Sequence, residues 1–277
     1  MKRFILILLC VITAACGIDR QDEDEMLVID GWIDSGGRPV VMVSSTLAVS
    51  SESISMDELE SHVENWARVS ISDGEEEDVL LGKRDDKYFP PYIYTSTSLR
   101  GEEGKTYTIE AYSKGRTVKA RTSIPKAAEL TNIRAVRSKD KDSLYTICAD
   151  LKEKPAGRAC YKVFTMIEGK DSTYKPSFFG NFDETNFGPG ENSLDILPPV
   201  TQKWRDFDSY FHSGDKVRIK FCTMDEEAYA YWCGFEEILT LSRNPMFPVT
   251  RSLRSNVEGG LGLWAGYGAS FYTIDIP

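Results

Sequence analysis

Apolar and polar residues alternate over short stretches in the first half of the chain, which is the period of a half-buried β-strand. The alternation is clearest over 106–112, where Tyr107, Ile109 and Ala111 occupy every second position. The strand patterns of this half cover 27–33, 40–44, 67–73, 78–82, 106–112 and 117–124. Short strands separated by turns predict a β-sandwich, which we place at 26–125 because Pro125 follows the last strand.

The second half begins with the same pattern and then departs from it. Its strand patterns cover 131–136, 143–150, 160–168 and 215–222. Residues 169–213 form a long, aromatic connection rich in glycine, proline and asparagine, and a connection of this length is usually functional or disordered. Apolar residues at helical spacing predict one amphipathic helix over about 225–241, with acidic residues in its first turn. The fold class is therefore mainly β, with two consecutive immunoglobulin- or fibronectin-III-like sandwiches, 26–125 and 126–277.

The first fifteen residues have the order of a secretory signal. A positively charged start is followed by an apolar stretch over 4–12 and by small residues up to Ala15. Cys16 comes directly after them, as in the lipobox of bacterial lipoproteins, where this cysteine is acylated and becomes the first residue. We therefore expect residues 1–15 to be removed and Cys16 to hold the protein on a membrane; ordinary signal cleavage with a free Cys16 is the alternative.

Residues 16–25 join this anchor to the first strand and contain the acidic run 21–25. One interpretation is a linker that repulsion between like charges keeps extended. The other rests on a resemblance, because surface lipoproteins of the Bacteroidota carry an acidic export signal just past the lipid-bearing cysteine. The resemblance favours a protein that is lipid-anchored to the outer membrane and faces the cell exterior.

The charge balance narrows the classes of partner. The formal net charge is −10 and the pI is near 4.9, with no basic run in the sequence. Nucleic-acid binding needs lysine and arginine to displace counterions from phosphates, so we expect no nucleic-acid partner.

Four cysteines remain once the signal and the acylated residue are set aside. They are Cys148, Cys160, Cys222 and Cys233. An even number in an exported chain is compatible with two disulfides and allows three connectivities. The predicted strands over 144–149 and 160–166 flank a turn, so a hairpin would bring Cys148 opposite Cys160, and the remaining two would pair. Zinc is disfavoured because the spacing lacks CxxC pairs and a nearby histidine, so we predict no metal site.

The aromatic connection supplies the candidate ligand or partner residues. They are Phe178, Phe179, Phe182, Phe187, Trp204, Tyr210 and Phe211. Aromatic faces are large and rigid contacts for sugars, peptides or a protein partner. Packing of the same side chains into the core is the alternative, with at least equal weight.

Catalysis finds little support in the sequence. The two histidines, His62 and His212, lie outside any metal motif, and no GxSxG nucleophile elbow is present. The carboxylate clusters 75–78 and 225–227 lack calcium-loop spacing, so a solvated face and a helix start explain them. We expect no catalytic residue, no cofactor and no enzymatic activity.

Several short motifs occur in order along the chain. They are Val28-Ile29-Asp30-Gly31-Trp32-Ile33, Phe221-Cys222-Thr223-Met224-Asp225, Tyr229-Ala230-Tyr231, Asn244-Pro245-Met246-Phe247 and the run 255–267. Together they resemble the domain-of-unknown-function family 4249 of Bacteroidota outer-membrane lipoproteins, over essentially the whole mature chain. The resemblance implies a β-rich surface lipoprotein, often encoded near a TonB-dependent outer-membrane transporter, with no established activity or ligand.

The glycines of the most specific motif, Asn-x-x-Gly-Gly-Leu-Gly over 256–262, have a structural explanation. Gly259, Gly260 and Gly262 supply positive φ or let another backbone approach closely, which predicts a tight turn before a last strand over 269–274. A phosphate-binding loop is the alternative, but neither GxGxxG nor GK[ST] accompanies the run.

These observations favour a surface-exposed lipoprotein that acts as a non-enzymatic binding or accessory module, associated with a TonB-dependent β-barrel transporter. An adhesion or structural module whose sandwiches act as spacers is the alternative from another class. A carboxylate-dependent hydrolase is the third hypothesis, because paired carboxylates can cleave glycosides. The ligand stays open.

Overall fold

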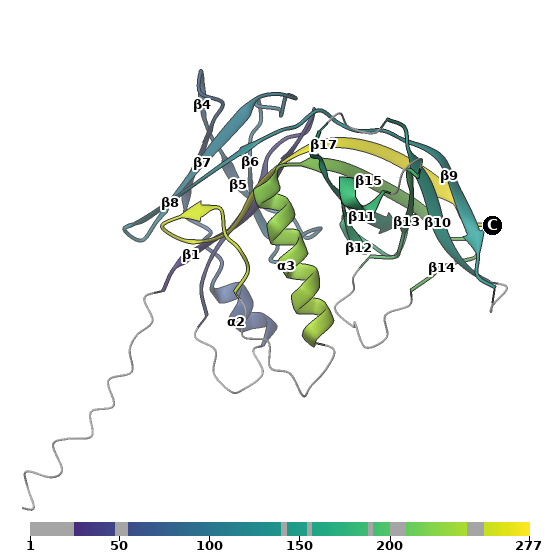
Figure 1. Ribbon diagram of the computed structural model, residues 1–277. Helices are drawn as coiled ribbons and strands as arrows, with labels where there is room; N and C mark the ends of the chain where they lie inside the picture. The colour runs from purple at the N-terminus through teal and green to yellow at the C-terminus, as the bar shows by residue number, and fades with distance from the viewer. Residues whose placement is uncertain are drawn as a thin grey trace, which may run out of the picture.

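The computed structural model describes residues 25–47, 55–139, 143–153, 157–187, 191–199, 209–242 and 252–277. Within these residues the protein is mainly β, as the sequence predicts, and it contains three sheets and two α-helices (Figure 1). The strands are β1 (Leu27–Asp34), β2 (Val40–Ser45), β3 (Arg68–Ser72), β4 (Glu77–Val79), β5 (Leu81–Arg84), β6 (Tyr92–Thr95), β7 (Thr106–Ser113), β8 (Arg116–Ser123), β9 (Leu130–Arg137), β10 (Leu144–Leu151), β11 (Cys160–Ile167), β12 (Lys175–Asp183), β13 (Ser193–Ile196), β14 (Phe211–His212), β15 (Lys216–Met224), β16 (Val257–Glu258) and β17 (Leu261–Asp275). The helices are α2 (Met56–Ser61), α3 (Glu226–Ser242) and the 3-10 turn η1 (Glu184–Asn186).

The last strand, β17, joins the two halves of the molecule. Eight strands form one sheet in the order β12-β11-β15-β17-β1-β2-β6-β5. The first part of β17 runs parallel to β1, from Val28 opposite Leu261 to Asp34 opposite Tyr267. Its second part pairs antiparallel with β15, as far as Lys216 opposite Asp275. A single strand therefore carries the sheet from one half into the other, as Figure 1 shows in yellow.

One face of β17 contributes side chains to both main cores. On one face, Trp264 is fully buried in the N-terminal core, which the sheet β16-β8-β7-β3-β4 closes. On the same face, Tyr272 and Ile274 pack against the C-terminal core, which β9, β10, β13 and β14 close. The division into two immunoglobulin- or fibronectin-III-like sandwiches stays a prediction, because β17 contributes to both cores.

The glycine motif shapes the approach of β17 to β1. A Cβ on Gly260 would lie 2.5 Å from the carbonyl oxygen of Leu27, and one on Gly262 would lie 1.8 Å from that of Ile29. The side-chain amide of Asn256 bonds both the N–H and the carbonyl of Trp264, at 2.9 and 2.8 Å. The motif is thus a turn with a close backbone approach, but the strand after it starts at Leu261, not at 269.

The segment 169–213, predicted as a long connection, contributes β12, β13 and β14 to the two sheets of the C-terminal half, with the 3-10 turn η1 between β12 and β13. β13 and β14 have only four and two residues, too few for a periodic signal, and the nine residues of β12 do not alternate in burial because its pairing with β11 is irregular. The predicted helix over 225–241 is α3, which begins and ends one residue later. Neither helix in the described part of the chain is long and apolar enough to span a membrane.

The predicted disulfides are wrong, since Cys148, Cys160, Cys222 and Cys233 are all free thiols. The hairpin that would have joined Cys148 to Cys160 does not form. β10 pairs with β9, β13 and β14, whereas β11 pairs with β12 and β15 in the other sheet. Cys148 instead contacts Arg134 and Ser193, at 3.1 and 3.0 Å.

We therefore expect a mature chain carrying Cys16→Ser to release four reactive thiols in denaturant without any reductant, one for each free cysteine. In the native state the three buried thiols, Cys148, Cys160 and Cys222, should react far more slowly than half-buried Cys233, because reaction requires access to the sulfur. Titration with a chromogenic disulfide reagent measures both quantities. A count of two or none in denaturant would contradict the structure.

Candidate functional site

Helix α3 lies across the face of the large sheet opposite to the two main cores (Figure 1). Its start is fixed by Asp225, whose carboxylate accepts a hydrogen bond from the N–H of Ala228 at 2.8 Å, as a residue before a helix typically does. The other oxygen of Asp225 accepts from the hydroxyl of Thr122 on β8, also at 2.8 Å. Glu226 and Glu227 occupy the first turn, where the helix dipole favours negative charge.

The inner face of α3 packs on aromatic side chains of the sheet. Trp232 meets Phe164 edge to face, with ring centroids 5.4 Å apart. Its indole N–H donates to the hydroxyl of Tyr267 at 2.8 Å. Edge-to-face rings combined with a satisfied indole N–H give the helix a fixed position on the sheet.

A buried ion pair holds the middle of the helix. Lys162 on β11 is fully buried, and its ammonium lies 3.0 Å from a carboxylate oxygen of Glu236 on α3. The same oxygen accepts from the N–H of Gly180 on β12, and the ammonium lies 5.0 Å from the ring centroid of Trp232. Burial lowers the pKa of Lys162, and the nearby Glu236 carboxylate counteracts this. Glu236 therefore clamps α3 to both β11 and β12.

A second buried pair lies further along the same face, where Lys220 is 2.6 Å from Asp34. Rings of three aromatic residues surround the ammonium at 5.0 to 5.9 Å from their centroids; they belong to Trp32, Phe164 and Tyr267. Burial is the largest single influence and disfavours the charged ammonium, but attraction to Asp34 and its hydrogen bond, together with Cys222 and Tyr174, outweigh it and raise the pKa of Lys220. The face beneath α3 thus combines aromatic packing with paired charges.

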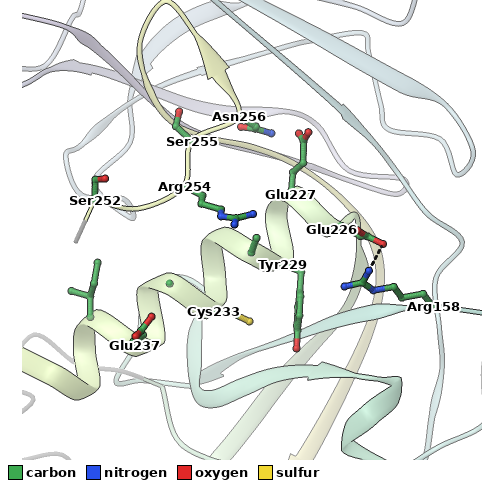
Figure 2. A pocket seen from close by; sticks show the side chains of 13 residues that line it. Arg158, Glu226, Glu227, Tyr229, Cys233, Glu237, Ser252, Arg254, Ser255 and Asn256 are labelled. Atoms are coloured by element: carbon green, nitrogen blue, oxygen red, sulfur yellow. Dashed lines mark ion pairs between the residues drawn. The ribbon is translucent and has the colours of Figure 1, made fainter. Parts of the chain in front are cut away.

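The outer side of α3 borders a wide pocket of about 1060 Å³, shown in Figure 2. The lining comes from three parts of the chain: residue 158, the length of α3 and the segment 252–256. Its side chains include Arg158, Glu226, Glu227, Tyr229, Cys233, Glu237, Ser252, Arg254, Ser255 and Asn256. Arg254 extends from its segment toward the helix.

Charges of both signs line this pocket. Arg158 pairs with Glu226 at 3.1 Å, the dashed contact in Figure 2, but both side chains are more than half exposed. Such an exposed pair contributes at most about 1 kcal/mol to stability, so these side chains are available to rearrange around a ligand. Glu227 and Glu237 add carboxylates along the helix. The lining therefore suits a polar or charged partner surface.

Tyr229 and Cys233 are the pocket residues of α3 that also contact the sheet side of the helix. The Tyr229 hydroxyl donates to a carboxylate oxygen of Asp183 at 3.0 Å, which ties α3 to the end of β12. Burial is the main cause that raises the pKa of Tyr229 above its ordinary range, and Asp183 adds to the effect. Burial also raises the pKa of the Cys233 thiol, so this cysteine is not an activated nucleophile.

The predicted aromatic residues separate into different environments. Phe211 is fully buried in the C-terminal core, and Phe182 and Phe187 pack against that core. Phe178 is buried and lies against Phe179, with ring centroids 4.1 Å apart. Tyr210 is half-buried, and Trp204 lies outside the described residues. Only Phe179 among those described is largely exposed, so core packing accounts for most of the set.

The pocket was missed because the sequence motifs that contain some of its residues, such as 229–231 and 255–267, gave no sign that these segments lie together with Arg158 and Arg254. Arg158 and Arg254 lie almost one hundred positions apart in the sequence, and only the fold brings them to the same pocket. Lys162 offered a signal, as a charged residue inside the apolar run 160–167. No group of three His, Cys, Asp or Glu side chains within the described residues is placed to hold a metal ion.

These features define a mainly β protein whose two cores share one long strand and whose helix borders a charged pocket. A family model described as "Domain of unknown function (DUF4249)" matches residues 16–272, so the chain belongs to this family. No curated protein matches the chain.

Proposed function

We propose that the protein is a surface-exposed outer-membrane lipoprotein, acylated on Cys16, that serves as a non-enzymatic binding or accessory module of a TonB-dependent nutrient transporter. Its body consists of two consecutive immunoglobulin- or fibronectin-III-like units, 26–125 and 126–277. The observation that carries the proposal is the charged pocket beside α3, because a wide, polar recess on a rigid helix suits recognition of a partner surface.

The position of the pocket relative to the anchor supports this function. Asn256 lines the pocket and directly precedes β16, which pairs with β8 at Val257. After β16, Gly260 lies close to Leu27 at the start of β1. The chain runs from Leu27 back to Cys16, so one wall of the pocket is on the side of the body from which the chain leaves toward the membrane. A barrel in the same membrane is then within reach of the pocket.

Purification of the acylated protein from native outer membranes in mild detergent tests the proposal. We expect a β-barrel protein to co-purify in stoichiometric amount. With the double variant Glu227→Arg, Glu237→Arg, the amount of co-purified barrel should fall by roughly tenfold or more. Reversed charges at a complementary interface cost several kcal/mol. Mass spectrometry of the eluate measures both results.

The matched control is Glu75→Arg, Glu76→Arg, which makes the same change of charge at an exposed turn between β3 and β4. This variant should retain the barrel. An acylated wild-type protein that elutes alone would overturn the proposal and favour an adhesion module. Equal loss in both double variants would show that net charge, and not the pocket, is responsible.

A further inference from the structure

One end of the N-terminal half is a connected corner built from three segments. Glu25, just before β1, pairs with Arg116 at the start of β8 at 3.0 Å. Lys114, in the turn between β7 and β8, pairs with Glu64 at 2.8 Å, and Ser113 donates to the same carboxylate at 2.7 Å. Glu64 lies three residues after Ser61, the last residue of α2. Figure 1 shows the start of β1 and the β7–β8 hairpin at the same end of the body.

This corner exposes large apolar side chains. Trp66 is 96% exposed, the largest exposed fraction among the large apolar residues of the described chain. Tyr112, opposite Arg68 in the sheet, is 49% exposed, and Met26 is 36% exposed. The indole ring combines a large apolar area with one polar N–H, so an exposed tryptophan suits a boundary between water and an apolar phase.

Two cations of the corner are already paired. Lys114 and Arg116 each have a carboxylate partner, Glu64 and Glu25. With a net charge of −10 on the whole chain, attraction to anionic head groups is not available as a driving force. A surface that offers tryptophan, tyrosine and methionine beside paired charges matches the interface of a bilayer, where amphipathic rings concentrate.

The anchor places this corner next to the membrane. The chain from Cys16 to Asp24 has nine residues, which span at most about 30 Å when fully extended. It joins the body at Glu25, which is itself part of the corner. Whatever the orientation of the body, the part that is tethered most closely to the bilayer is therefore the corner that carries Met26 and Trp66.

We infer that this corner, formed by Met26, Trp66 and Tyr112, rests on the lipid bilayer and inserts the Trp66 indole at its interface. The inference depends on acylation of Cys16, which belongs to the proposed function. Contact with lipid sets the orientation of the body, so the pocket beside α3 faces a fixed direction relative to the membrane. Because the driving force is apolar, the contact is insensitive to salt.

The experiment reconstitutes the acylated full-length mature protein into phosphatidylcholine vesicles that contain lipids brominated near the head group. Bromine quenches tryptophan only at close approach. We expect quenching of the wild type and loss of most of this quenching in Trp66→Phe, with no change in melting temperature, since Trp66 makes almost no contact with the fold. Added salt should leave the quenching unchanged.

The control is the double variant Trp66→Phe, Val136→Trp, which moves the exposed tryptophan to β9 in the other half, where Val136 is 43% exposed. It should remain unquenched. Equal quenching of wild type and Trp66→Phe, or none in either while the protein floats with the vesicles, would overturn the inference and leave a protein partner for the corner. Failure to float with the vesicles would instead count against acylation and the proposed function.

Discussion

Replacing Glu236 by alanine is expected to destabilise the protein by about 3–5 kcal/mol, because it leaves the Lys162 ammonium buried without its carboxylate. Lys162 has no solvent exposure, and Glu236 is only 14% exposed, so water replaces little of the lost interaction. The N–H of Gly180 loses its acceptor at the same time. Urea unfolding of the mature Cys16→Ser chain, followed by circular dichroism, measures the change in the free energy of unfolding.

Two further variants distinguish loss of the ion pair from a general effect of replacing a glutamate of α3. Glu237→Ala makes the same change one position along α3, at an exposed side chain, and should alter stability by no more than about 1 kcal/mol, the value of an exposed ion pair. Lys162→Met combined with Glu236→Leu removes both charges and should recover most of the loss, since well-packed apolar residues often replace a buried pair without cost. An unchanged unfolding midpoint in Glu236→Ala would contradict the clamp.

The sequence correctly predicted those strands and helices whose own residues show a clear periodic pattern of apolar side chains. The alternation over 106–112 corresponds to β7, and the helical spacing after Asp225 corresponds to α3. Both elements bury one face, so their periodicity carries the information. The start of β17 was placed eight residues late because Gly262 and Gly266 interrupt its apolar pattern. Those glycines are required by the backbones that pass beside them, Ile29 and Ser123, which the sequence around 262–266 does not reveal.

The disulfide error has a related origin. The residues between Cys148 and Cys160 contain a turn signal, and a hairpin is the usual result of two strands around a turn. Here β10 and β11 enter different sheets, and β10 finds its partners in β9, β13 and β14. Strand pairing between distant segments is a tertiary property, so spacing alone was an insufficient guide.

The candidate site shows the same limit. The prediction of an aromatic binding site relied on composition. Phe211 and Phe178 are instead buried in the protein, because burial of large apolar rings is favourable. The charged lining of the pocket, with Arg158 and Arg254 on separate segments, has no sequence signal of its own. Family membership does not supply the missing information, because the family is described only as a domain of unknown function.

Gly262→Ala is expected to prevent stable pairing of β1 with β17 and to cost about 4 kcal/mol or more, which places it among the exceptional single substitutions. The added Cβ would lie 1.8 Å from the carbonyl oxygen of Ile29, its partner across the sheet, and the backbone at Gly262 has φ of +116°. Neither group is a flexible side-chain end, so relief requires the two strands to separate. Soluble yield and thermal unfolding of the mature chain measure the effect.

Gly104→Ala provides the matched comparison, because Gly104 also has positive φ, +81°, but a Cβ there meets nothing within 4 Å. It should cost only about 1 to 2 kcal/mol, the penalty of the left-handed backbone itself. The difference between the two variants isolates the close approach of β1 to β17. Since β17 carries one face of both cores, its loss should unfold the two halves in a single transition. A Gly262→Ala protein as stable as Gly104→Ala would show that the strands tolerate separation and would contradict the glycine motif's structural role.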